Sequence, residues 1–139
     1  MTRLPTQVVH ADFNPHNLLA DPNAPDAISG ILDFGDMVRT PRICDLAVAA
    51  SYLVDPEAPL SLLLPLVTAY HARLPLLPQE LGLLPDLITA RMLTTLTIAG
   101  WRAARYPENA AYILRNAPSA ETGLLVLRKA DPARLADAL

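Results

Sequence analysis

Prolines limit the folding of this chain more than any other residue type, because a proline inside a helix removes a backbone hydrogen bond and clashes with the preceding turn. There are 14 prolines in 139 residues, about twice the usual share. None lies between Asp86 and Tyr106. Apolar residues recur there at helical spacing, so we predict a central core helix about 30 Å long. Its predicted apolar surface comprises Leu87, Ile88, Met92, Leu93, Leu96, Ile98, Ala99 and Trp101.

The other helical candidates are shorter, and prolines mark several of their boundaries. Apolar residues at three- and four-residue spacing predict a helix from Ile43 to Val54, which Pro56 would end. A similar pattern from Leu60 to Arg73 contains Pro65, which predicts either a kink there or a helix that begins near it. Three more candidates span residues 109–116, 120–129 and 132–139.

Short extended segments precede the helices. Residues 7–9, 17–20 and 28–32 are apolar or β-branched, and residues 21–26 are rich in turn formers. This order predicts a small β-hairpin with polar side chains at its strand ends. We therefore expect an α+β fold and a single domain over residues 1–139, with site-bearing strands and loops in 1–40 and helices in 42–139.

Composition restricts the class of partner and the cellular setting. The net charge of -3 and the pI of about 5.5 argue against a basic surface for nucleic acid or an anionic membrane. The longest uncharged stretch in the apolar middle, Ala58 to Ala72, is shorter than the ~20 residues of a membrane span. The N-terminus lacks the apolar segment of a secretory signal. The single cysteine, Cys44, forms no internal disulfide, so we expect a reducing, cytoplasmic setting.

The residues that suggest chemistry lie in two short segments, His10-Ala-Asp-Phe-Asn-Pro-His-Asn17 and Ile31-Leu-Asp-Phe-Gly-Asp36. They place carboxylates and an amide at the ends of neighbouring strands. Such oxygen donors suit Mg²⁺, which keeps several waters and accepts phosphate oxygens. With Asn17 and Asp33 as metal ligands, Asp12 would be free to meet a substrate hydroxyl. This pattern predicts phosphoryl transfer.

The same segments resemble a known family. His10-x-Asp12-x-x-x-x-Asn17 followed by Asp33-Phe-Gly is similar to the catalytic and metal-binding loops of protein-kinase-like folds. The missing arginine after His10, and Asp36 followed by Asp45-Leu-Ala, resemble the aminoglycoside phosphotransferase and choline kinase superfamily. Within it, Asp33-Phe-Gly-Asp-Met-Val and Asp45-Leu-Ala-Val-Ala-Ala-Ser-Tyr are most similar to the hydroxylysine kinase-like branch.

The resemblance implies a role for each matching residue. Asp12 would be the catalytic group that accepts or orients the proton of the attacking hydroxyl. Asn17 would bind Mg²⁺, and Asp33 would bridge Mg²⁺ to the phosphates of ATP or GTP. His10 would mainly brace the loop. The Asp45 side chain would cap the following helix or tie that helix to the loop.

Several other polar residues have two interpretations. Asp36 either accepts loop hydrogen bonds or contacts a substrate or second metal. Asn14 and His16 line the loop, and solvated polar side chains are the more ordinary interpretation of both. Arg91, in an apolar helix, is either paired inside the protein or extends its charged end to water.

The aromatic residues of the helical half also have two interpretations. Tyr70, Trp101 and Tyr106 could form a wall for a cationic amine. Aromatic residues at helical spacing more commonly belong to the core, and we expect that here.

The family resemblance covers only part of a complete kinase. A nucleotide-binding lobe needs a glycine-containing loop and a phosphate-binding lysine. The sole lysine, Lys129, lies near the other end of the chain, so we expect an isolated C-terminal lobe of a protein-kinase-like fold. One hypothesis is a kinase lobe for hydroxylysine, ethanolamine, choline or aminoglycoside hydroxyls, inactive alone. The other is a non-catalytic module that forms a homo-oligomer through the surface left by the missing lobe.

Overall fold

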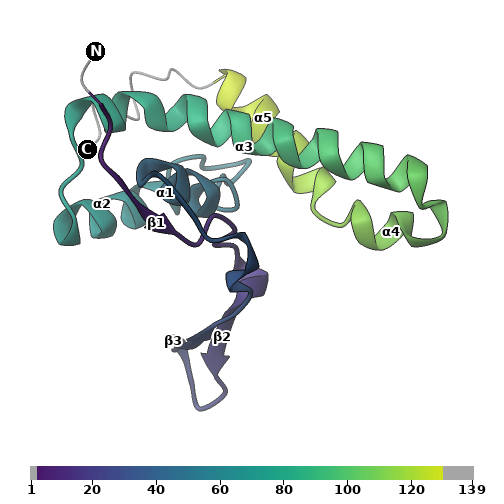
Figure 1. Ribbon diagram of the computed structural model, residues 1–139, viewed down its shortest axis with the longest axis horizontal. Helices are drawn as coiled ribbons and strands as arrows, with labels where there is room; N and C mark the ends of the chain where they lie inside the picture. Colours follow the sequence, from purple (N-terminus) through teal and green to yellow (C-terminus); the bar gives the residue numbers. More distant parts are fainter. Residues whose placement is uncertain (1–2, 130–139) are drawn as a thin grey trace.

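The computed structural model describes residues 3–129 and has an α+β architecture. Figure 1 shows the longest helix lying across the top, with shorter helices beneath and beside it and a β-hairpin projecting away from them. The helical region therefore forms the body of the molecule. The hairpin and the loops next to it form a separate projection.

Two small antiparallel sheets lie within residues 6–41. β1 (Thr6–Val9) pairs with β4 (Val38–Pro41), and β2 (Leu18–Asp21) pairs with β3 (Ala24–Ile31). The hairpin expected from the sequence is therefore present. Its turn is shorter than residues 21–26, because β3 already begins at Ala24. Strand β4 was not expected.

Helices α1 (Ile43–Ala50) and α2 (Leu63–Arg73) are both shorter than the sequence pattern predicts. α1 ends before Ser51, whose hydroxyl donates to the Val48 carbonyl at 2.7 Å, so the predicted extension to Val54 is wrong. α2 begins two residues before Pro65. The first backbone N–H groups of a helix have no acceptor within the helix. Proline, which has no N–H group, is therefore tolerated in the first turn of α2 without a kink.

Helix α3 (Pro78–Arg105) has 28 residues, which corresponds to about 42 Å. The expected start at Asp86 is therefore wrong, because the helix continues through Pro85. The missing amide of an internal proline costs about 3 kcal/mol in an isolated helix. Here the turn before Pro85 is anchored by Glu80 and by fully buried Leu84, which offset that cost.

A buried ion pair joins the start of α3 to the start of α1. The Arg42 guanidinium donates from Nε and Nη2 to the two Glu80 carboxylate oxygens at 2.9 and 2.7 Å. Nη2 also donates to the Pro75 carbonyl, and the Leu77 amide donates to Glu80 Oε2. The hydrogen bond from Arg42 holds the pKa of Glu80 below its usual value, and that of Arg42 is raised.

The hydrophobic core lies between the helices. Only part of the apolar surface predicted on α3 is in it: Ile88 and Met92 are buried, whereas Leu93, Ile98 and Trp101 are 52%, 51% and 64% exposed. The expectation that Trp101 and Tyr106 belong to the core is wrong, while Tyr70 packs against it. The core cluster consists of Ile43, Leu46, Ala47, Ala50, Leu63, Val67, Leu76, Leu84, Ile88, Met92 and Ala120.

The chain then returns along α3. After η3 (Pro107–Asn109) come α4 (Ala110–Ile113) and α5 (Ala117–Lys129), close to the predicted segments. Gly123 allows α5 to approach α3, because a Cβ there would lie 2.5 Å from the Met92 methyl carbon. The predicted helix at residues 132–139 lies outside the described residues.

By length and composition alone, α3 could cross a membrane, with an 18-residue window of mean hydropathy 1.3. The same helix supplies core residues and an arginine that is paired with a loop aspartate, but only 17% of that window is buried, so the expected interior role is met by only part of the helix. The absence of a membrane span stays a prediction from the sequence.

Candidate active site

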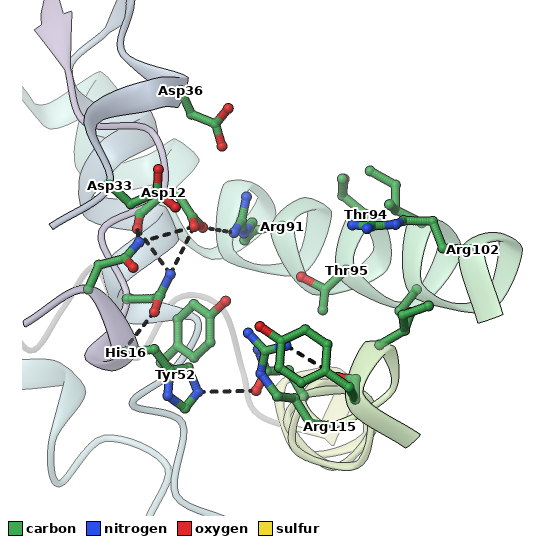
Figure 2. Close-up of a pocket in the computed structure, with 17 residues that line it drawn as sticks. Asp12, His16, Asp33, Asp36, Tyr52, Arg91, Thr94, Thr95, Arg102 and Arg115 are labelled. Atoms are coloured by element: carbon green, nitrogen blue, oxygen red, sulfur yellow. Dashed lines mark hydrogen bonds and ion pairs between the residues drawn. The ribbon is translucent and has the colours of Figure 1, made fainter. Parts of the chain in front are cut away.

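The loop after β1 is the first element of the site. Ala11 has φ of 66°, a left-handed conformation that is uncommon for a residue with a side chain. Its amide donates to Asp45 Oδ1 at 2.8 Å, so the first turn of α1 holds the loop in this conformation. This turn directs the next residue, Asp12, toward α3 (Figure 2).

Both carboxylate oxygens of Asp12 are held in place. Oδ1 accepts from Arg91 Nη2 of α3 at 2.6 Å, and the two side chains are each 25% exposed. Oδ2 accepts from Asn14 Nδ2 at 2.9 Å and from Asn17 Nδ2 at 3.2 Å. A carboxylate offers about four acceptor positions, so roughly one remains free.

His10 joins the two site loops. Its Nε2 lies 2.8 Å from the Leu32 carbonyl, and its Nδ1 accepts from the Asp12 amide at 3.3 Å. These partners require the proton on Nε2. The ring also packs near Phe13 and Phe34, with centroids 5.8 and 5.1 Å away. The buried imidazole thus connects the Asp12 loop to the Asp33 loop.

The turn η1 (Pro15–Asn17) fixes the amide side chains. Asn14 is buried at the cap of this turn, and its Oδ1 accepts from the His16 amide at 2.9 Å. The Asn17 amide group donates to the Asp12 backbone carbonyl as well as to its carboxylate. This orientation leaves Asn17 Oδ1 as the oxygen available to a cation. His16 is exposed and reaches Asn116 at 3.4 Å.

Asp33 precedes η2 (Phe34–Asp36) in a left-handed conformation, with φ of 59°. Its carboxylate makes no capping hydrogen bond to that turn. Neither ion pair found in residues 3–129 includes Asp33 or Asp36. Both carboxylates are therefore exposed toward solvent and available to a ligand.

All these polar side chains except His10 and Asp45 line one open cavity of about 520 Å³, shown in Figure 2. This volume lies in the range of small-molecule sites. The loops contribute one wall, and α3, α4 and the residues after α4 contribute the other. Its lining residues are Asp12, Asn14, His16, Asn17, Asp33, Asp36, Tyr52, Arg91, Thr94, Thr95, Ile98, Ala99, Arg102, Tyr112, Ile113, Arg115 and Asn116.

Comparison with known proteins identifies the family. A model of the phosphotransferase enzyme family matches residues 2–84, more than half of the chain and all of the loop wall. The chain belongs to this phosphotransferase family. The resemblance inferred from the two loop motifs is thereby confirmed.

The curated relatives of this phosphotransferase chain include hydroxylysine kinases. The Danio rerio protein is 36% identical over 108 residues, and those of Bos taurus and Mus musculus are 30% and 29% identical over 112 residues. Each match covers 76% of this chain but only 30% of the relative. The matched part of the chain therefore spans under a third of the length of those proteins. No solved structure matches it.

The donor set at the two phosphotransferase loops fits a magnesium ion. A free carboxylate on Asp33 and a free amide oxygen on Asn17 border the same cavity. Residues 3–129 contain no group of three or more His, Cys, Asp or Glu side chains that could hold a metal. Two protein ligands nevertheless suit Mg²⁺, which retains waters and binds phosphate oxygens.

Sequence reasoning missed the second wall of the phosphotransferase cavity. Arg91 was expected either to be paired inside the protein or to extend its charged end to water, and the first alternative is found. Arg102 and Arg115 did not stand out. A cation in an apolar helix is a usable signal, but its partner lies 79 residues away along the chain. The alternative of an aromatic wall from Tyr70, Trp101 and Tyr106 is not found, because none of the three lines the cavity. Tyr52 and Tyr112 line it instead.

Proposed function

We propose that this chain is the catalytic lobe of a small-molecule kinase. It would transfer the γ-phosphoryl group of ATP or GTP, with Mg²⁺, to a hydroxyl of an amino-alcohol type acceptor. The observation that carries this proposal is the meeting of Asp12, Asn17 and Asp33 at one cavity of about 520 Å³. Membership in the phosphotransferase family supports the reaction class.

Asp12 is the residue we assign to the acceptor hydroxyl. The free acceptor position on its carboxylate would take the hydroxyl hydrogen while the hydroxyl oxygen forms its bond to the γ-phosphorus. The bond from that phosphorus to the leaving nucleoside diphosphate breaks, and the proton leaves the acceptor oxygen. Arg91, Asn14 and Asn17 hold Asp12 in a fixed orientation, which reduces the entropy lost in reaching the reactive geometry.

Asn17 Oδ1 and the Asp33 carboxylate are the groups that would hold Mg²⁺. When bound, the ion neutralises phosphate charge during transfer. The left-handed backbone at Asp33 aims a carboxylate without protein partners toward the cavity, while Asn17 is oriented by its bonds to Asp12. His10 keeps the two ligand-bearing loops together through the Leu32 carbonyl.

The relatives support the proposed acceptor class. Proteins named hydroxylysine kinase match 76% of the chain, which supports an amino alcohol as acceptor. Ethanolamine, choline and aminoglycosides belong to the same broad class. The cavity has room for any of the smaller molecules.

An exposed apolar surface favours a second candidate, a non-catalytic module that associates with itself. Large apolar side chains of the strand region are 42–58% exposed. A surface of this kind commonly marks an interface. Sedimentation at increasing concentration tests it, since a chain that stays strictly monomeric would contradict self-association. The side chains are Val8, Leu19, Ile28, Ile31, Leu32, Phe34, Met37 and Val38.

The lobe alone is expected to be inactive, so phosphoryl transfer can be tested by joining the chain to a nucleotide-binding lobe and incubating it with Mg²⁺, ATP or GTP, and hydroxylysine, ethanolamine, choline or an aminoglycoside. We expect a phosphomonoester detectable by mass spectrometry, formed at least about 100-fold more slowly by Asp12→Asn. Asp26→Asn, an exposed carboxylate of the hairpin, is the matched control and should keep the wild-type rate. An equal rate for Asp12→Asn would contradict its role, and no product from the joined lobes with any acceptor would favour the non-catalytic module.

A further inference from the structure

The cavity has two walls of opposite charge. Asp12, Asp33 and Asp36 belong to the loops, whereas Arg91, Arg102 and Arg115 belong to α3 and to the segment before α5. Figure 2 shows the aspartates together on one side and the arginines spread along the helical side. A ligand that spans the cavity meets carboxylates at one end and guanidinium groups at the other.

The three arginines are not equivalent. Arg91 is ion-paired with Asp12, so its charge is already matched. Neither of the two ion pairs in residues 3–129 includes Arg102 or Arg115. Both guanidinium groups therefore border the cavity without a carboxylate partner among the described residues. A guanidinium presents five donors in a planar fork that matches a carboxylate or phosphate.

Arg115 is held in place by its neighbour. Its guanidinium stacks on the Tyr112 ring at 4.0 Å, and Nη1 donates to the Tyr112 carbonyl at 3.2 Å. Most of its donors remain available. An arginine fixed in this way loses less side-chain entropy on binding an anion than a freely moving one.

We propose that Arg102 and Arg115 form a subsite for the carboxylate of the acceptor. This rests on the proposed function and narrows its acceptor class to hydroxylated amino acids. With the hydroxyl at Asp12, a carboxylate on the far end of the acceptor would lie on the arginine side. Choline and aminoglycosides carry cationic groups and no carboxylate, so the two unmatched arginines would oppose their binding.

Phosphate shares the chemistry that guanidinium groups recognise, so the test must separate the two anions. We would titrate the chain calorimetrically with three compounds. The first is hydroxylysine. The second is its decarboxylated counterpart, which keeps the hydroxyl and both amines. The third is inorganic phosphate. Arg102→Gln and Arg115→Gln are the test variants. Arg105→Gln is the matched control, because Arg105 lies on α3 against Trp101 and Tyr106 and outside the cavity.

We expect wild type and Arg105→Gln to bind hydroxylysine at least about tenfold more tightly than the decarboxylated compound. Arg102→Gln and Arg115→Gln should each remove most of this preference. Circular dichroism of each variant would verify that it is folded.

Three results would overturn the subsite. They are equal binding of the two amines by wild type, no binding of either, and tighter arginine-dependent binding of phosphate than of hydroxylysine. None of these decides the kinase proposal, because Mg²⁺ and ATP binding through Asp33 is measured separately without an acceptor.

Discussion

The helical region and the strand region of this molecule are stabilised in different ways. Residues 43–129 contain the core cluster, in which six large apolar side chains are fully buried, including Ile43, Leu84 and Ile88. Among the residues from 3 to 41 whose burial the structure describes, Val9 is the only buried hydrophobic side chain, and His10 and Asn14 are the buried polar ones. The site is therefore positioned chiefly by hydrogen bonds and ion pairs, on a base supplied by hydrophobic packing.

A few polar contacts transmit the rigidity of the helices to the loops. The Ala11 amide bonds to Asp45 of α1, and Asp12 is paired with Arg91 of α3. The Arg42–Glu80 pair fixes α1 against α3, which carry those two partners. Loss of one of these contacts should affect the two regions unequally. That difference can be measured.

The largest effect is expected at the buried ion pair. Arg42→Met leaves the Glu80 carboxylate fully buried without its charged partner, which should lower the free energy of unfolding by about 3–5 kcal/mol. Urea denaturation followed by circular dichroism would measure it. Arg39→Met, at an exposed position of β4, is the control and should change stability by less than about 0.5 kcal/mol. A similar small change for Arg42→Met would mean that the pair does not support the helical region.

A smaller, local effect is expected for Asp45→Ala. The Ala11 amide loses its acceptor, which should cost about 1–3 kcal/mol and raise the hydrogen-exchange rate of that amide. The hydrogen-exchange rates of core amides in α3 should rise only as far as the loss of global stability requires. Asp26→Ala provides the comparison, since this aspartate is exposed on the hairpin. Unchanged exchange at Ala11 would show that α1 does not hold the site loop.

The smallest effect concerns pH. The hydrogen bond from Arg42 lowers the pKa of Glu80 in the folded protein, relative to a usual value of 4.5. The ion pair therefore contributes its full stabilisation at pH values above the usual pKa of Glu80, and this stabilisation is lost as the pH falls through the lower pKa of the folded protein. Its size is about 1.4 kcal/mol for each unit by which the two pKa values differ. Urea midpoints measured across this acidic range should decline.

The variant Arg42→Met with Glu80→Gln is the control for the pH experiment. It removes the titrating carboxylate together with its partner, so its midpoints should decline less in acid than those of wild type. Parallel declines in the two proteins would assign the acid sensitivity to other carboxylates.

Sequence patterns were most informative where a local rule operates. The α+β class, the β2–β3 hairpin and the membership in the phosphotransferase family were all predictable, because turn chemistry and motif spacing are local. The start of α3 was not, because tertiary contacts of Glu80 and Leu84 override the local effect of Pro85. The exposure of Trp101 was also missed, since periodicity identifies an apolar face without saying what covers it.

Prediction of the site was similarly divided. The polar side chains of the two loops except His10 come together at one cavity, as expected for residues at neighbouring strand ends. The arginine wall depends on the packing of α3 and α4 beside those loops. No spacing rule connects Asp12 to Arg91 or to Arg115, so this half of the cavity required the structure.

The central claim is that Asn17 and Asp33 form a metal-phosphate site beside Asp12. It is tested most directly by calorimetric titration of Mg²⁺ with ATP, and then GTP, into the chain and its Asp33→Ala variant, with Asp26→Ala as control. We predict binding that requires Mg²⁺, is lost in Asp33→Ala and is kept in Asp26→Ala. Binding that survives in Asp33→Ala, or no binding to the wild-type chain, would contradict the claim.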